Sequence, residues 1–104
     1  MEKNELEKVI NQKIEYEIAF KNGYNFVLYS DDPESLSEPS VDYDSFSSIG
    51  YYDGFNYGDY CCRVGLRYAV MPDNLIAQMD KSFTQALNRH NNYIHGEDPE
   101  ARVR

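Results

Sequence analysis

Apolar and polar positions follow a helical spacing at the start of the chain. Residues 4–13 place Leu6, Val9 and Ile10 on one stripe of a helix. Asn4 is suited to cap this helix, and Glu7 follows three residues later, as in a capping box. The pattern therefore predicts a short N-terminal helix.

The spacing changes to alternation over residues 14–21. The apolar positions of this stretch are Ile14, Tyr16, Ile18 and Phe20. Alternation of this kind is typical of a strand, and the Asn22-Gly23 pair that follows is typical of a hairpin turn. A three-residue loop over 22–24 pairs Phe20 with Phe26 and keeps the apolar face in register. A longer first helix that ends at Gly23 is the alternative, and the sequence leaves it open.

Further strands are predicted beyond a long polar connection. Residues 30–45 are rich in serine, aspartate and proline, which predicts a loop of functional or mobile character. Residues 46–52 and 55–60 then predict two strands around an Asp53-Gly54 turn, and residues 60–70 alternate most clearly of all. Glycine recurs every fourth position in this region, which we interpret as tight turns or a bulged edge. These glycines are Gly50, Gly54 and Gly58.

Residues 72–95 give the clearest helical pattern in the chain. Asp73 is a suitable N-cap with Pro72 just before it, and Gly96 ends the pattern. One continuous apolar face is formed by Leu75, Ile76, Met79, Phe83, Ala86, Leu87, His90 and Ile94. The order helix, strands, helix predicts a two-layer α+β fold. It would hold an antiparallel sheet of three to four strands, an N-terminal helix and a long C-terminal helix. We assign residues 1–96 to a single domain and residues 97–104 to a polar tail.

Charge is distributed unevenly along the 104 residues, whose formal net charge is -8. No lysine or arginine occurs between Lys21 and Arg63, whereas eight aspartates and glutamates do. This balance disfavours direct binding to nucleic acid or to an anionic membrane, because both attract basic surfaces. It favours a basic protein surface as partner, although solubility alone also explains a high net charge.

Residues 42–60 combine carboxylates with aromatic rings and form the candidate partner-binding site. Tyrosine offers stiff contact area at low entropic cost, and its ring accepts arginine by cation–π contact. The alternative is that the tyrosines pack half-buried on a sheet while the aspartates mark turns. The candidate residues are Asp42, Tyr43, Asp44, Tyr51, Tyr52, Asp53, Phe55, Tyr57, Asp59 and Tyr60.

Other chemistry receives little support from the sequence. Asp42, Asp44 and Asp53 do not fit a calcium loop, because Ser47 stands where its glycine is needed. Cys61 and Cys62 are adjacent and lack the spacing of a zinc site, so we expect free thiols, no metal and no cofactor. The charged N-terminus lacks a secretory signal and no stretch reaches membrane-spanning length, which predicts a cytoplasmic protein.

Residues 89–95, "RHNNYIH", place five residues between Arg89 and His95. This spacing resembles that of the HEPN ribonucleases, which are helical bundles with the arginine–histidine pair at a dimer contact. The predicted sheet argues against the resemblance, and His90 lies on the apolar stripe as a packed side chain would.

We therefore expect a non-enzymatic, acidic binding protein. Its most concrete form is an inhibitor that blocks the basic, nucleic-acid-binding surface of a partner protein. Phage proteins that block host defence, anti-CRISPR proteins among them, are similar in size and charge. Two alternatives remain: a toxin-neutralising immunity protein, and a homo-oligomeric accessory domain, for example a homodimer.

Overall fold

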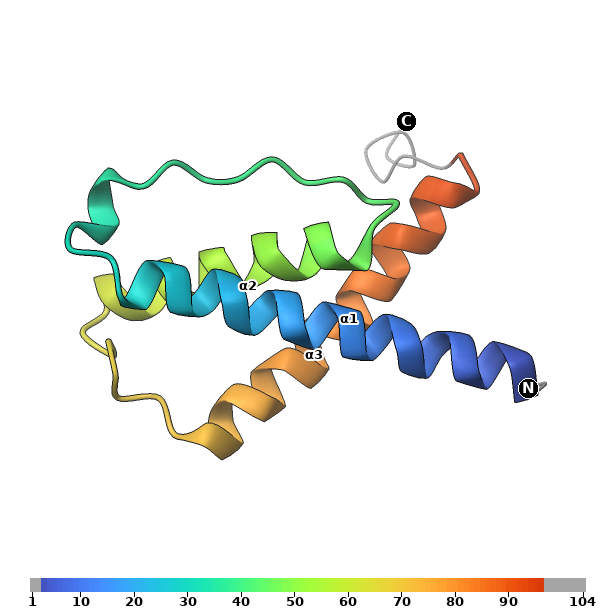
Figure 1. The fold of residues 1–104 in the computed structure, drawn as a ribbon, viewed down its shortest axis with the longest axis horizontal. Helices are drawn as coiled ribbons and strands as arrows, with labels where there is room; N and C mark the ends of the chain where they lie inside the picture. Colours follow the sequence, from blue (N-terminus) through green and yellow to red (C-terminus); the bar gives the residue numbers. More distant parts are fainter. Residues whose placement is uncertain (1–2, 97–104) are drawn as a thin grey trace.

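Residues 3–96 of the chain fold into three long helices and one short turn of 3₁₀ helix (Figure 1). The computed structural model describes residues 3–96, and within this range there is no β-strand. The helices are α1 (Lys3–Leu28), η1 (Pro33–Ser35), α2 (Phe46–Arg63) and α3 (Pro72–Ile94). The predicted α+β fold with an antiparallel sheet is therefore wrong. The predicted tail at 97–104 lies outside the described residues.

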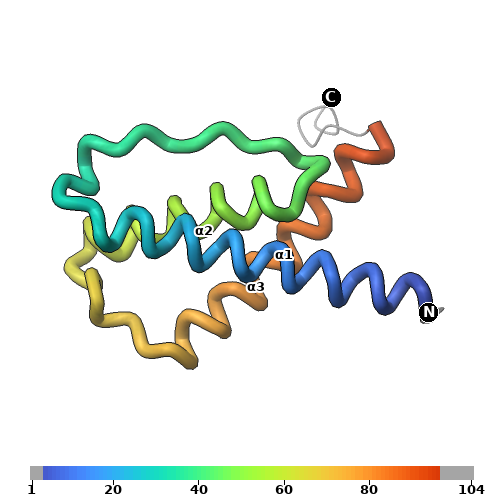
Figure 2. The backbone as a smooth tube through the Cα atoms, in the orientation of Figure 1, coloured from blue at the N-terminus to red at the C-terminus, as the bar shows by residue number. Residues whose placement is uncertain are grey.

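Helices α1 and α2 lie side by side and run in the same direction, and α3 crosses them (Figures 1 and 2). The molecule measures 43 × 35 × 18 Å along its principal axes. The shortest dimension fits about two layers of helix, since one helix with its side chains is roughly 10–12 Å wide. The connection from α1 to α2 returns along the length of α2 (Figure 1).

The strand predicted over residues 14–21 is instead the middle of α1. Its apolar side chains form two rows, and within each row they recur every fourth residue. The two rows are offset by two residues, which produces the alternation. Positions two apart lie about 200° apart on a helix, so the two rows face opposite sides. One row is buried: Tyr16, Phe20, Tyr24 and Leu28. The other is about half exposed: Leu6, Ile10, Ile14 and Ile18.

The predicted features around this strand also change. The hairpin turn at Asn22-Gly23 is wrong, because α1 continues through both residues to Leu28. The alternative of a longer first helix is correct, although that helix passes Gly23. Asn4, the predicted cap, lies inside the helix, which begins at Lys3.

Glycines determine how closely α2 approaches α1. A Cβ on Gly50 would collide with the carbonyl oxygen of Tyr16, and one on Gly54 with that of Phe20. A Cβ on Gly58 would lie 3.0 Å from the carbonyl oxygen of Tyr24. The missing side chains let the two backbones meet, as small residues do wherever helices pack closely. The glycine row therefore marks a helix contact, and the predicted strands at 46–52 and 55–60 and the turn between them are wrong.

Helix α3 confirms the prediction of a C-terminal helix. It begins with Pro72 as its first residue, and the N-cap is Met71, so the prediction of Asp73 as the cap is wrong. Gly96 follows the helix with a φ of 72°. Four of the predicted face residues are buried, whereas Ile76 and Ile94 are about half exposed. The buried four are Met79, Phe83, Ala86 and His90.

The strand predicted at 60–70 is also wrong, since these residues form the end of α2 and the connection to α3. Side chains of this connection form hydrogen bonds with the C-terminal end of α1. Arg67 donates from Nε to the carbonyl oxygen of Leu28 at 2.8 Å and from Nη2 to that of Ser30 at 2.6 Å. The Tyr68 hydroxyl donates to the Leu28 carbonyl at 2.7 Å. These bonds satisfy acceptors that the end of a helix leaves open.

Candidate interaction surface

The ten predicted partner-binding residues lie on α2 and on the segment before it, but only some are accessible. Asp42, Asp44 and Tyr60 are exposed, and Phe55 is only 5% exposed. The other six are partly buried: Tyr43, Tyr51, Tyr52, Asp53, Tyr57 and Asp59. The structure therefore does not present the ten side chains as one outward-facing set.

Asp53 joins all three helices from the inside of the bundle. Its Oδ2 accepts a hydrogen bond from the Tyr16 hydroxyl at 2.7 Å and pairs with Arg89 Nη2 at 2.6 Å. Only 13% of the Asp53 side chain is exposed, against 28% of the Arg89 side chain. Burial, and then the bond to Asp53, raise the pKa of Tyr16. This carboxylate is thus neutralised inside the protein and contributes little to the outer charge.

Two further predicted residues are also engaged within the chain. Asp59 pairs with Arg63 at 2.8 Å, one turn along α2. The Tyr57 ring lies 5.6 Å from that of Tyr24 and 6.0 Å from that of Phe20, between centroids. Tyr57 therefore belongs to the aromatic packing between α1 and α2.

The exposed negative charge gathers on the connection between α1 and α2. We name residues 31–44 the acidic segment. All six of its carboxylate residues are exposed, and within residues 3–96 none of them forms an ion pair. They are Asp31, Asp32, Glu34, Glu38, Asp42 and Asp44. The segment contains no lysine, arginine or histidine, so no positively charged side chain of its own offsets its negative charge.

The acidic segment is attached to the helices at its second half. The Asp42 amide donates to Ser48 Oγ at 2.8 Å, and His90 Nδ1 lies 2.7 Å from the Tyr43 carbonyl oxygen. His90 is buried against the Phe46 ring, as its place on the apolar stripe predicts. The pKa of Tyr52 is raised, chiefly by a hydrogen bond to the Glu38 carboxylate. Glu38 is therefore held next to Tyr52 of α2, and the second half of the acidic segment is attached to the helices rather than forming a free loop.

The remaining candidates for chemistry are the two cysteines, a metal site and the Arg89–His95 pair. Cys61 is buried and Cys62 partly buried, both as free thiols, and burial raises the pKa of Cys61. Among residues 3–96 no three histidine, cysteine or acidic side chains are grouped to hold a metal ion. The predicted sheet no longer argues against the HEPN resemblance, but the Arg89 guanidinium is engaged by Asp53, while His95 is exposed at the end of α3.

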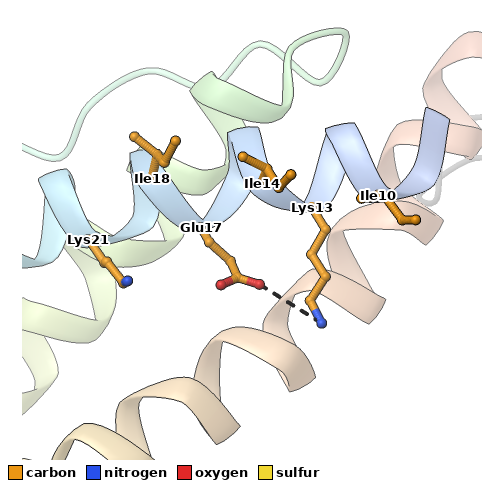
Figure 3. A pocket seen from close by; sticks show the side chains of 6 residues that line it. All are labelled: Ile10, Lys13, Ile14, Glu17, Ile18 and Lys21. Carbon is orange, nitrogen blue, oxygen red and sulfur yellow. Dashed lines mark ion pairs between the residues drawn. The ribbon is translucent and has the colours of Figure 1, made fainter. Parts of the chain in front are cut away.

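A shallow apolar groove on α1 was missed by the sequence analysis. Its lining is Ile10, Lys13, Ile14, Glu17, Ile18 and Lys21 (Figure 3). Lys13 pairs with Asp80 of α3 at 2.9 Å and lies 3.9 Å from Glu17. The alternating pattern assigns the isoleucines to a sheet face. Their spacing of four residues from Leu6 onwards was the signal that could have revealed an exposed helical row.

Comparison with protein families, curated proteins and solved structures gives no match. Within the part of the chain that the structure describes, no helix has a run long and apolar enough to cross a bilayer. The function is therefore argued from the surfaces described above.

Proposed function

We propose that this is a non-enzymatic cytoplasmic protein that binds a basic surface of a partner protein through its acidic segment. The surface it covers is one that otherwise binds nucleic acid, so binding inhibits the partner. The observation that supports the proposal is the set of six exposed carboxylates on one irregular segment without a cation.

The attachment of the segment favours a recognition role. A segment already held against α2 loses less conformational freedom on binding than a free loop would. Its uncompensated charge accelerates encounter with a positive surface, and this acceleration falls as salt rises. Tyr43 lies between Asp42 and Asp44 in the sequence, and Tyr52 is hydrogen-bonded to Glu38. Both tyrosines are partly buried, and their exposed parts are the surface offered to arginine side chains.

Two triple variants with the same net charge test the proposal. The first replaces carboxylates of the acidic segment: Asp31→Asn, Glu34→Gln and Asp44→Asn. The control replaces exposed carboxylates on α1 and α3: Glu5→Gln, Glu15→Gln and Asp73→Asn. Each variant removes three negative charges, so only the position of the lost charge differs.

Partners captured by the wild-type protein are purified, and their association rates are measured with and without duplex DNA. We expect the segment variant to slow association about tenfold or more at low salt, the control to slow it much less, and DNA to compete. Equal effects of the two variants would contradict the role of the segment. Partner binding that does not change when DNA is added would contradict the inhibition of a nucleic-acid-binding site.

A ribonuclease similar to HEPN domains is a second candidate, favoured by the all-helical fold of residues 3–96 and by the Arg89–His95 spacing. His95→Ala separates the two functions, because His95 is exposed and its substitution leaves the Asp53 network intact. Cleavage of single-stranded RNA by the wild-type protein, lost in this variant, would favour the ribonuclease.

A further inference from the structure

An exposed row of aliphatic side chains runs along α1. Leu6, Ile10, Ile14 and Ile18 are 51%, 49%, 52% and 59% exposed. We name these four residues the α1 ridge. They are spaced by four residues, so they form one continuous ridge of the kind that packs into a groove of another helix. Contiguous apolar surface of this kind on a soluble protein marks an interaction site.

The N-terminal half of α1 also lacks support from α2. Gly50, near the start of α2, lies against the Tyr16 backbone, and α1 projects beyond this point past α3 (Figures 1 and 2). A helical segment of about a dozen residues is marginal in water without tertiary contacts. A partner on the α1 ridge would supply such contacts where the bundle provides few.

We propose that a second copy of this chain covers the α1 ridge. The two α1 helices lie antiparallel, with a two-fold axis passing next to Ile14. Ile14 then packs on the partner's Ile14, and Ile10 packs beside the partner's Ile18. Such a contact is self-complementary, as a two-fold dimer requires.

The charges near the ridge favour this arrangement. Glu7 and Lys21 lie seven positions before and after Ile14, on the face that carries the ridge. The two-fold axis therefore sets each Glu7 opposite the partner's Lys21. Lys13 and Glu17 border the same groove (Figure 3), and the axis brings Glu17 near the partner's Lys13. A parallel pair would set Glu7 against Glu7 and Lys21 against Lys21, and like charges in contact oppose association.

The mass of the protein in solution gives the first test. Size-exclusion chromatography with light scattering should show twice the chain mass of 12.1 kDa. Ile14→Asp should return the mass to one chain, whereas Ile76→Asp should leave the dimer intact. Ile76 is a matched control, because it is 50% exposed on α3 and outside the ridge. A wild-type monomer at the highest soluble concentration, or equal effects of the two variants, would overturn the proposal.

Cross-linking tests the position of the axis. In a Cys62→Ser background, Ile14→Cys should form a disulfide-linked dimer under mild oxidation, because the two copies of residue 14 meet at the axis. Ile18→Cys alone should not, whereas its mixture with Ile10→Cys should. Lys21→Glu should weaken the dimer about fivefold or more, and adding Glu7→Lys should restore it. A dimer that lacks the residue-14 cross-link, or is not restored by the charge exchange, would refute this geometry.

The dimer and the acidic segment are tested independently, since they use different elements of the chain. Loss of dimerisation in Ile14→Asp with unchanged partner association would sustain both proposals. Failure of the charge variants described above would leave the dimer prediction unaffected.

Discussion

Replacement of Gly54 by alanine tests the packing of α1 against α2 most directly. The new Cβ would overlap the Phe20 carbonyl oxygen and would lie 2.7 Å from the carbonyl carbon and 2.8 Å from the α-carbon of the same residue. Carbon atoms pack comfortably at about 3.5 Å, so the new methyl group would approach the α-carbon about 0.7 Å too closely. All three atoms belong to the backbone, and no side chain can rotate away. The two helices must therefore separate locally.

The expected cost combines two opposing effects. Overpacking a well-packed contact costs about 1–3 kcal/mol and sometimes more, whereas alanine favours a helix over glycine by about 1 kcal/mol. Because the neighbouring atoms are rigid backbone, we expect the overpacking cost to lie at the upper end of its range. After the gain in helix propensity is subtracted, Gly54→Ala should lower the free energy of unfolding by about 2 kcal/mol. The midpoint of urea unfolding, followed by circular dichroism, measures the change.

Gly58→Ala is the matched control on the same row. Its Cβ would meet the Tyr24 carbonyl oxygen at 3.0 Å and Val27 Cβ at 3.1 Å, a smaller overlap. We expect the propensity gain to offset most of this cost, so the variant should unfold near the wild-type midpoint. A Gly54→Ala protein as stable as wild type, or a larger loss for Gly58→Ala, would refute the close-packing account.

Two further predictions concern buried polar groups. Asp53→Asn should lower the free energy of unfolding by about 2–3 kcal/mol, because it leaves Arg89 partly buried without its charge partner. Adding Arg89→Met should cost less than the sum of the two single changes in urea unfolding, and additive costs would argue against the network. Burial raises the pKa of Tyr24 from 10.0 to about 12. The folded state keeps a proton on Tyr24 that the unfolded chain loses, so the contribution of Tyr24 to stability should be constant below about pH 10 and be lost between pH 10 and 12. Tyr24→Phe should flatten that fall in urea titrations across this range, and an unchanged slope would contradict the assignment.

Helix α3 could be predicted because a single signal dominates its sequence. One apolar stripe spans the helix, Pro72 suits its first turn, and Gly96 suits its end. Helix α1 could not be distinguished from a strand in the same way. Its buried row and the α1 ridge are offset by two residues, so together they imitate the alternation of a strand.

Helix α2 was misread because its glycines disfavour both regular structures when considered alone. Gly54 becomes intelligible only beside Phe20 of α1, and no pattern within α2 shows that neighbour. The backbone of another helix therefore decides a feature that local propensity cannot.

The uneven charge was visible in the sequence, but its neutralisation was not. Asp53 meets Arg89, 36 positions away, through tertiary packing, so it could not be separated from the exposed carboxylates in advance. Asp59 and Arg63 are four residues apart, and their pairing required the assignment of a helix. The exposed negative charge therefore lies on the acidic segment rather than on α2, where the sequence placed part of it.

The bonds from Arg67 and Tyr68 make the two ends of α1 unequal. At its C-terminal end the last carbonyls are held by a connection that also leads into α3. At the opposite end, the first turns have few neighbours. In a single copy of the chain, without a partner on the α1 ridge, fraying of α1 therefore starts from one side only, and amide protons along this helix should exchange with solvent more slowly from Leu6 towards Leu28.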